Sequence, residues 1–457
     1  MKRAGATFFP RTFFSESRRT LLLAVPIMAG QLSQMLMGLT DSAMVGRVGV
    51  VPLAASSFAN GLLSVPFLFG IGLMQAISVC VSQAHGAGDR RETGELLRHG
   101  LAITGVAGLV LVALTAFAST QLGHFGQPPE VARASQNYFL LCGASMLPML
   151  LALGLKQYSE ALNHPWPPML ILLGSVPLNA ALNWILIYGN LGAPALGLTG
   201  AGLATLLSRI AALAAVIAYI LRARRFADAL PESWKRPLQW ERARSLLKIG
   251  LPGAGQLLLE VSAFTVATIK IGWLGAEALA AHQIALTCAS TSFMFPLGIG
   301  LATTIRIGQA LGAGEAARVR AIGLASFALG VVVMSAAGLV FAFGNEWIAR
   351  AFVEDAGVTR IAAKLLVIAA FFQIFDGLQV VGSCTLRGLS DATVPMVACL
   401  VGYWLVFLPF AWLAAFRFGY GAAGVWCGLA AALAIVALSL FVRFIVKSGA
   451  INPQIWV

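Results

Sequence analysis

Long apolar segments, separated by short basic or Gly/Pro-rich breaks, dominate the pattern of hydrophobic and polar positions in this chain. A helix of about 20 apolar residues crosses a hydrocarbon core roughly 30 Å thick, and each segment is at least that long. We therefore expect twelve spanning helices, at approximately 20–44, 53–82, 96–122, 135–155, 167–189, 197–221, 246–272, 279–307, 319–343, 361–386, 394–416 and 421–446.

The composition agrees with this pattern. The chain is 59% hydrophobic and 11% charged, with a mean hydropathy of +0.84. An ordinary soluble domain is about 25% charged. We predict an all-α integral membrane protein.

The net charge of +13 could indicate nucleic-acid binding, but the positions of the basic residues argue against it. Most of them lie at the two ends of the chain, in the even-numbered loops and in the segment 222–248, whereas the odd-numbered loops hold few. Those few are chiefly Arg47, Arg133, Arg350 and Arg360. By the positive-inside rule, both termini are cytoplasmic. We expect no nucleic-acid partner.

The sequence shows an internal repeat. A shift of about 226 positions places Gln83-Ala-His-Gly-Ala-Gly-Asp89 on Gln309-Ala-Leu-Gly-Ala-Gly-Glu315, and Pro168 on Pro395. Each copy holds six spans, an even number, so the copies share one membrane orientation. Parallel repeats of this type are a transporter architecture. We predict two six-helix bundles, 1–221 and 249–457, joined by a flexible cytoplasmic linker at 222–248.

Three carboxylates lie inside the predicted spans: Asp41, Glu260 and Asp376. An ionisable group at the bilayer centre costs about 2.5 to 3.5 kcal/mol on insertion scales, so such residues are rarely kept without a use. The alternative is structural, with each acid held in an ion pair, for which Arg209 in the sixth span is the candidate partner.

Amides share helix faces with these acids, because residues three or four positions apart lie on one face. Such stripes must face protein or water, since lipid offers them no partner. Asparagines also commonly hold membrane helices together, which is the competing interpretation of Asn179 and Asn183. The candidate polar residues are Gln34, Asn179, Asn183, Gln256, Gln373 and Gln379.

Other kinds of site find no support in the sequence. The six cysteines fall singly in or beside spans and are interpreted as packed thiols. The histidines show no zinc or catalytic spacing, and nucleotide-binding motifs are lacking. Transport energy should then come from an ion gradient, and we expect no cofactor.

Several residues together resemble the multidrug and toxic compound extrusion (MATE) family, in its NorM-type bacterial branch. The resemblance covers essentially the whole chain. It rests on the duplicated six-span plan, Pro26 with Asp41, Asn179 and Asn183 ahead of Ile187-Tyr-Gly189, Glu260 with Phe264, Arg306 running into Gly312-Ala-Gly314, Asp376, and Leu386-Arg-Gly388.

The resemblance implies an antiporter of the bacterial inner membrane that expels cationic or amphipathic drugs in exchange for Na⁺ or H⁺. Glu260 and Asp376 would match the cation-site acids of the C-terminal lobe, with Na⁺ as a possible ligand. Asp41, Asn179 and Asn183 would match the polar cluster of the N-terminal lobe. Family members differ in the ion and in the lobe that dominates. We expect a monomer whose partners are drugs and membrane lipids.

Two other functions compete with this one. A lipid-linked oligosaccharide flippase of the same superfamily would line its cavity with more cationic residues, whereas the buried charge here is acidic apart from Arg209. A membrane-embedded enzyme or receptor is the third possibility. The internal duplication and the lack of a catalytic constellation count against it.

The predicted topology can be tested by cysteine labelling. A cysteine replacing Glu232 in the linker should stay unmodified by a membrane-impermeant reagent in intact cells and react after lysis. Labelling of the parent chain under the same conditions measures the background from its own cysteines. Modification in intact cells above that background would contradict a cytoplasmic linker.

Overall fold

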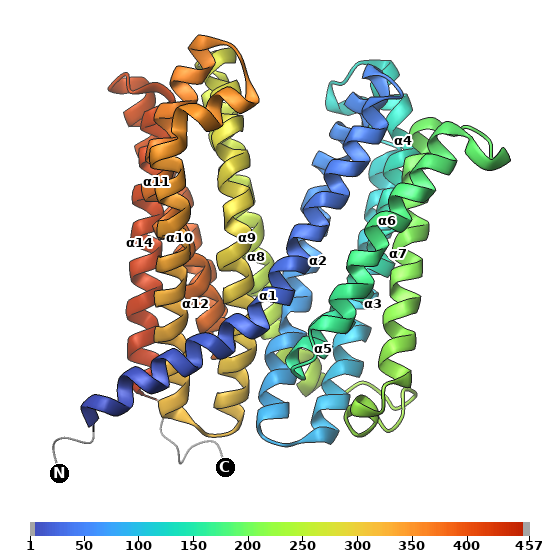
Figure 1. Ribbon diagram of the computed structural model, residues 1–457. Coiled ribbons are helices and arrows are strands. Elements are labelled where there is room, and N and C mark those ends of the chain that lie inside the picture. Colours follow the sequence, from blue (N-terminus) through green and yellow to red (C-terminus); the bar gives the residue numbers. More distant parts are fainter. Residues whose placement is uncertain (1–4, 451–457) are drawn as a thin grey trace. The chain divides into compact units, whose positions relative to one another are not determined.

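The computed structural model describes residues 5–450, with side chains described from residue 13 onwards, and this part of the chain is helical throughout (Figure 1). The α-helices are α1 (Gly5–Gly46), α2 (Val50–Gly86), α3 (Arg90–Ser119), α4 (Pro129–Ala144), α5 (Met146–Ala161), α6 (Trp166–Tyr188), α7 (Gly197–Arg222), α8 (Trp240–Gly272), α9 (Ala276–Gly312), α10 (Ala316–Phe352), α11 (Ala356–Gly388), α12 (Thr393–Cys399), α13 (Leu408–Trp412) and α14 (Gly421–Gly449). Short 3₁₀ segments are η1 (Leu122–Phe125), η2 (Asn190–Gly192) and η3 (Arg224–Ala229), while η4 (Leu400–Phe407) and η5 (Leu413–Arg417) are π-helical.

Twelve helical spans in residues 5–450 are long and apolar enough to cross a membrane, as the hydropathy pattern predicted. Two of them are composite. The span 129–161 breaks between α4 and α5 at Ser145, because Pro148 has no N–H to donate to the carbonyl of Ala144. The span 393–417 alternates α-helical and π-helical turns around Pro409.

By their internal contacts the described residues group into two compact units. We call residues 29–254 the N-terminal unit, and residues 5–28 with 255–450 the C-terminal unit. The boundaries fall inside α1 and α8, just after Pro26 and Pro252, which the repeat places at matching positions. Each of these helices therefore contributes one part to each unit. The division of the sequence at 1–221, 222–248 and 249–457 stays a prediction about domains.

Part of the linker between α7 and α8, for which we expected flexibility, contacts helices of the N-terminal unit. Tyr158 is fully buried and donates its hydroxyl to the carbonyl of Ala229 at 2.6 Å. His99 Nε2 accepts from the backbone N–H of Gln239 at 2.8 Å. α8 already begins at Trp240, so a helix covers the last part of the predicted linker.

Buried ion pairs occur inside the spanning helices, where the apolar pattern predicted only three acids. The described helices extend beyond the predicted apolar ranges, and Glu16, Glu95 and Glu160 are each at most 4% exposed. Their partners are, respectively, Arg306, Arg98 at 2.6 Å and Lys156 at 2.6 Å. All three acids are therefore neutralised by a neighbouring cation.

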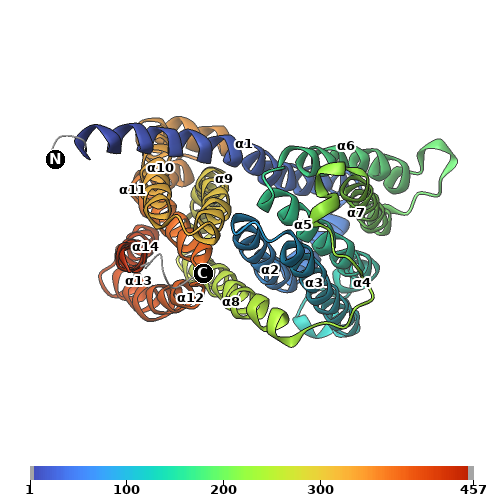
Figure 2. The same cartoon turned by 90° about the horizontal axis from the view of Figure 1, so that it is seen from below.

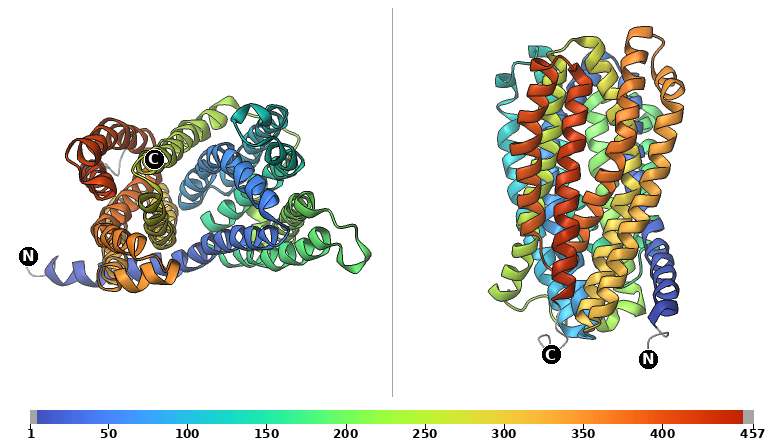
Figure 3. Two further views of the ribbon diagram at one scale, coloured as in Figure 1. Left: turned by 90° about the horizontal axis from the view of Figure 1, so that it is seen from above. Right: turned by 90° about the vertical axis from the view of Figure 1, so that its left-hand side faces the viewer.

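The pair of Glu16 and Arg306 anchors the first part of α1 within the C-terminal unit. That part lies beside α10 (Figures 2 and 3), and Arg318 of α10 approaches Glu16 Oε1 at 3.4 Å. Arg306 of α9 also donates to Thr20 Oγ1 at 2.5 Å and to the Glu16 carbonyl at 2.7 Å. Arg19 reaches Glu16 Oε1 at 4.0 Å, so three cations converge on one carboxylate.

Removal of that carboxylate should destabilise the C-terminal unit. Glu16→Gln leaves Arg306 buried without a counter-charge, and losing one member of a buried pair costs about 3 to 5 kcal/mol. The exposed pair of Glu346 and Arg350, at 3.1 Å, is the matched control, because Glu346→Gln should cost less than about 1 kcal/mol. Thermal unfolding in detergent measures both. Equal melting temperatures of the two variants would contradict the assignment.

Candidate functional site

The two acids of the C-terminal unit interact with each other inside the helix bundle. Glu260 lies on α8 and Asp376 on α11, where only 4% of Asp376 is exposed. The charge of Glu260 acts on Asp376, and Gln379 lies near enough to Glu260 to influence its charge. Acids from two helices and an amide from one of them therefore form one polar cluster.

A guanidinium completes the charges of this cluster. Arg387 of α11 is within electrostatic reach of Glu260, and its Nη2 donates to Gln256 Oε1 at 3.1 Å. Gln256 Nε2 donates in turn to Ser383 Oγ at 3.0 Å. Gln256 thus orients Arg387, since both its amide groups are engaged. The cluster holds two carboxylates and one cation.

Three buried oxygens beside these charges lack a hydrogen-bond partner among the described residues: Gln373 Oε1, Gln379 Oε1 and the hydroxyl of Tyr403. The amide nitrogens of the two glutamines are engaged, with Ser292 Oγ at 2.6 Å and Cys399 Sγ at 3.5 Å. An unpartnered buried polar atom is costly, typically about 1 to 3 kcal/mol. These oxygens are therefore available as ligands.

Aromatic rings form one side of the cluster. Phe264 of α8 packs edge-on against Phe372 at 6.5 Å and also contacts the ring of Tyr403 at 6.2 Å. The ring of Phe372 contacts that of Trp426, with 5.5 Å between the centroids. The indole N–H of Trp426 donates to His282 Nδ1 at 3.1 Å. Aromatic walls of this kind exclude water from a polar site and contribute attractive faces to an organic cation.

A second polar cluster lies in the N-terminal unit. Asn183 Nδ2 donates to Asp41 Oδ1 at 2.6 Å and lies 3.2 Å from Asn179 Oδ1. Both asparagines are fully buried on α6. Arg209 of α7 is within electrostatic reach of Asp41 and donates to Ser145 Oγ at 2.6 Å. Asp41 thus has an amide partner and a cation nearby, and the break between α4 and α5 presents the acceptor for Arg209.

The structure brings together eight of the nine candidate residues, in two groups. Gln256, Glu260, Gln373, Asp376 and Gln379 gather in the C-terminal unit, and Asp41, Asn179 and Asn183 in the N-terminal unit. Gln34 is half-buried on α1, and its part in either cluster stays a prediction. Sequence reasoning missed the roles of Arg387 and Tyr403. The tenth-span stripe that holds Gln379 and Ser383 continues to Arg387 at the same spacing, and this could have indicated it.

Comparison with known proteins decides the family. The family model described as MatE matches the chain twice, over residues 26–185 and 252–413. The chain belongs to the MATE family. The two matches also confirm the internal repeat, since they lie 226 to 228 positions apart.

Relatives of this MATE protein are similar over nearly their whole length. A probable multidrug resistance protein NorM of Bradyrhizobium diazoefficiens is 39% identical, covering 93% of this chain and 92% of its own length. One of Mesorhizobium japonicum is 37% identical, covering 98% of each. The twelve spans and the bacterial relatives make this a multi-pass inner-membrane protein, a transporter and not an enzyme.

Solved structures of other MATE transporters share the fold. The Vibrio cholerae MATE transporter VcmN in the bent form has a TM-score of 0.88 at 22% identity, covering 97% of this chain and 99% of that one. A eukaryotic MATE transporter gives 0.85 at 21% identity, covering 95% and 96%. At these identities the likeness shows the fold alone.

Proposed function

We propose that this MATE protein exports cationic or amphipathic drugs in exchange for one inward-moving monovalent cation, Na⁺ or H⁺, that binds at Glu260 and Asp376. The names of the bacterial relatives support multidrug efflux. We choose the C-terminal cluster as the ion site because the two clusters differ in charge. We further propose a monomer with both termini in the cytoplasm, as the distribution of basic residues indicates.

The charge count favours the C-terminal unit as the ion site. Glu260 and Asp376 carry two negative charges when ionised, and Arg387 supplies one positive charge. One negative charge is left, which a single monovalent cation or proton neutralises. In the N-terminal unit, Asp41 and Arg209 already compensate each other. A cation entering that cluster would gain less, because the site is neutral before it arrives.

Among monovalent cations, the oxygen atoms of the cluster favour Na⁺. Gln373 Oε1, Gln379 Oε1 and the Tyr403 hydroxyl are buried and unpartnered, and they accompany the two carboxylates. Hard cations prefer such oxygen ligands. A proton would neutralise a carboxylate without satisfying the amide oxygens, whereas a metal cation can draw on all of them.

Exchange follows if drug and ion compete for the same negative charge. A cationic drug held by Glu260 and Asp376 beside the Phe264 ring would displace the ion, and the ion would displace the drug. Each ligand must then weaken the binding of the other by the same factor. A flippase for a pyrophosphate-linked substrate would need an excess of positive charge, which the C-terminal cluster lacks.

The ion site can be tested without transport. Na⁺ should raise the thermal unfolding temperature of the purified protein, because a ligand that binds the folded state stabilises it. Glu260→Gln or Asp376→Asn should remove most of that increase and abolish drug uptake into proteoliposomes driven by a Na⁺ gradient. Gradients of Na⁺ and of pH, imposed separately, decide between the two ions.

Asp41→Asn is the matched control, since it also neutralises an intramembrane carboxylate. It should impair drug transport but retain the stabilisation by Na⁺. Stabilisation that survives in both Glu260→Gln and Asp376→Asn, but disappears in Asp41→Asn, would place the ion in the N-terminal unit. That outcome would overturn the charge argument.

Substitution of Arg387 should change the affinity for Na⁺ in the opposite direction. Arg387→Gln leaves two uncompensated carboxylates, so the affinity for Na⁺ should rise. At an effective dielectric constant of about 20, a nearby unit charge is worth on the order of a few kcal/mol, or more than tenfold in affinity. Titration of Na⁺ against the unfolding temperature measures this. A loss of Na⁺ affinity would mean that Arg387 only holds the cluster together.

A further inference from the structure

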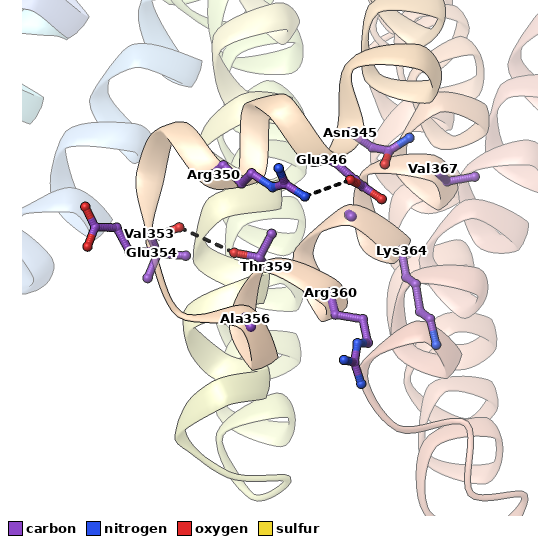
Figure 4. Close-up of a pocket in the computed structure, with 11 residues that line it drawn as sticks. Asn345, Glu346, Arg350, Val353, Glu354, Ala356, Thr359, Arg360, Lys364 and Val367 are labelled. Atoms are coloured by element: carbon purple, nitrogen blue, oxygen red, sulfur yellow. Dashed lines mark hydrogen bonds and ion pairs between the residues drawn. The ribbon is translucent and has the colours of Figure 1, made fainter.

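A cavity of about 760 Å³ lies where α10 ends and α11 begins, within the C-terminal unit (Figure 4). Glu260 and Asp376 are not among the residues that line it. The connection between α10 and α11 is at the opposite end of this unit from the last turns of α14 (Figure 1). Its polar lining residues are Asn345, Glu346, Arg350, Glu354, Arg360 and Lys364.

The cavity presents two basic side chains that are not neutralised by an ion pair. Arg350 is paired with Glu346 at 3.1 Å, as the dashed line in Figure 4 shows. Arg360 and Lys364 are exposed and make no ion pair with any residue in the described part of the chain. They lie four positions apart on α11, so they share one helix face and can hold a single anion together.

The N-terminus of α11 does not by itself provide a site for an anion. Asp355 caps this helix, with its carboxylate accepting from the backbone N–H of Val358 at 2.8 Å. The first turn thus already has its negative partner. An anion in the cavity would be held by side chains.

The same helix face becomes apolar toward the middle of the span. Val367 is 38% exposed and Phe371 is 66% exposed, and both continue the line of Arg360 and Lys364. On α10, Phe343 and Trp347 are also strongly exposed, as is typical of aromatic residues at a membrane interface. Exposed cations at the end of a span, followed by exposed apolar residues, match the order of groups in a phospholipid.

The depth of the two cations agrees with a headgroup. The midpoint of α11 is close to Phe372, and at 1.5 Å per residue Arg360 lies about 18 Å and Lys364 about 12 Å from it along the axis. Half of the hydrocarbon core is about 15 Å. The two side chains therefore bracket the level at which lipid phosphates begin.

We propose that this cavity binds the phosphodiester headgroup of a membrane phospholipid, with the phosphate at Arg360 and Lys364 and an acyl chain along Val367 and Phe371. Free phosphate shares the chemistry of the headgroup but would make no contact with the apolar face of Val367 and Phe371. The proposal does not depend on the ion or the substrate of transport.

The test is lipid binding to the purified full-length protein, by titration with phosphatidylglycerol in detergent and native mass spectrometry. The double variant Arg360→Gln with Lys364→Gln should bind the lipid roughly 30-fold more weakly, as expected for two basic residues at an anionic headgroup. Phe371→Ser should also weaken lipid binding. Equal unfolding temperatures in lipid-free detergent check that the variants are folded.

The internal repeat supplies a matched control. Arg133 corresponds to Arg360, with the same spacing of 227 that relates Pro168 to Pro395, and Asn137 stands where the second copy has Lys364. Arg133→Gln removes an exposed cation that has no second cation four positions away. The affinity for the lipid should therefore stay unchanged.

Two results would overturn the proposal. The first is phosphatidylglycerol binding that is as tight in the double variant as in the parent. The second is inorganic phosphate that displaces the lipid from the parent and binds independently of Phe371, which would make the cavity a site for soluble anions. Lipid binding that falls in both the double variant and Phe371→Ser, and not in Arg133→Gln, supports the lipid site.

Discussion

A charge inside the hydrocarbon region must be compensated within the protein, because lipid supplies neither water nor counter-ions. The buried acids beyond the ends of the apolar segments each have an adjacent cation. Glu16 has Arg306, Glu95 has Arg98, and Glu160 has Lys156. Glu260 has Arg387 within electrostatic reach, whereas the charge that acts on Asp376 is that of Glu260, another acid. This difference supports our proposal that a mobile cation binds at these two acids.

The two polar clusters are built from different residues, although the helical fold that holds them is duplicated. The spacing of 227 places Asn179 on Val406, Asn183 on Phe410 and Asp376 on Met149. These three residues thus have apolar residues at the matching places in the other copy, whereas Glu260 falls on Ser33 and Asp41 on Thr268. The repeat supplies helices at equivalent positions, while the ionisable groups differ between the copies. This explains how one unit can hold a neutral cluster and the other a charged one.

Apolar length and periodicity were enough to predict the twelve spans, the repeat and the three central acids. They could not predict the helix ends, because the helices continue past the apolar segments into polar residues such as Glu16 and Glu160. The break at Ser145 depends on one proline within an apolar run, and other prolines, such as Pro66 and Pro177, lie inside unbroken helices. Tyr403 joins the cluster from η4, so only the tertiary structure brings it to Glu260, whereas Arg387 lies on the same stripe of α11 as Gln379.

The boundaries of the compact units within α1 and α8 have a consequence for how the protein can be divided. Residues 5–28 pack with the C-terminal unit, and residues 240–254 pack with the N-terminal unit. A polypeptide that ended in the linker would lack the helical arm 240–254 and would carry residues 5–28 without the Arg306 that neutralises Glu16. The natural module of this transporter is therefore discontinuous in sequence. The beginnings of α1 and α8 therefore each belong to the unit that the other copy of the repeat mainly forms.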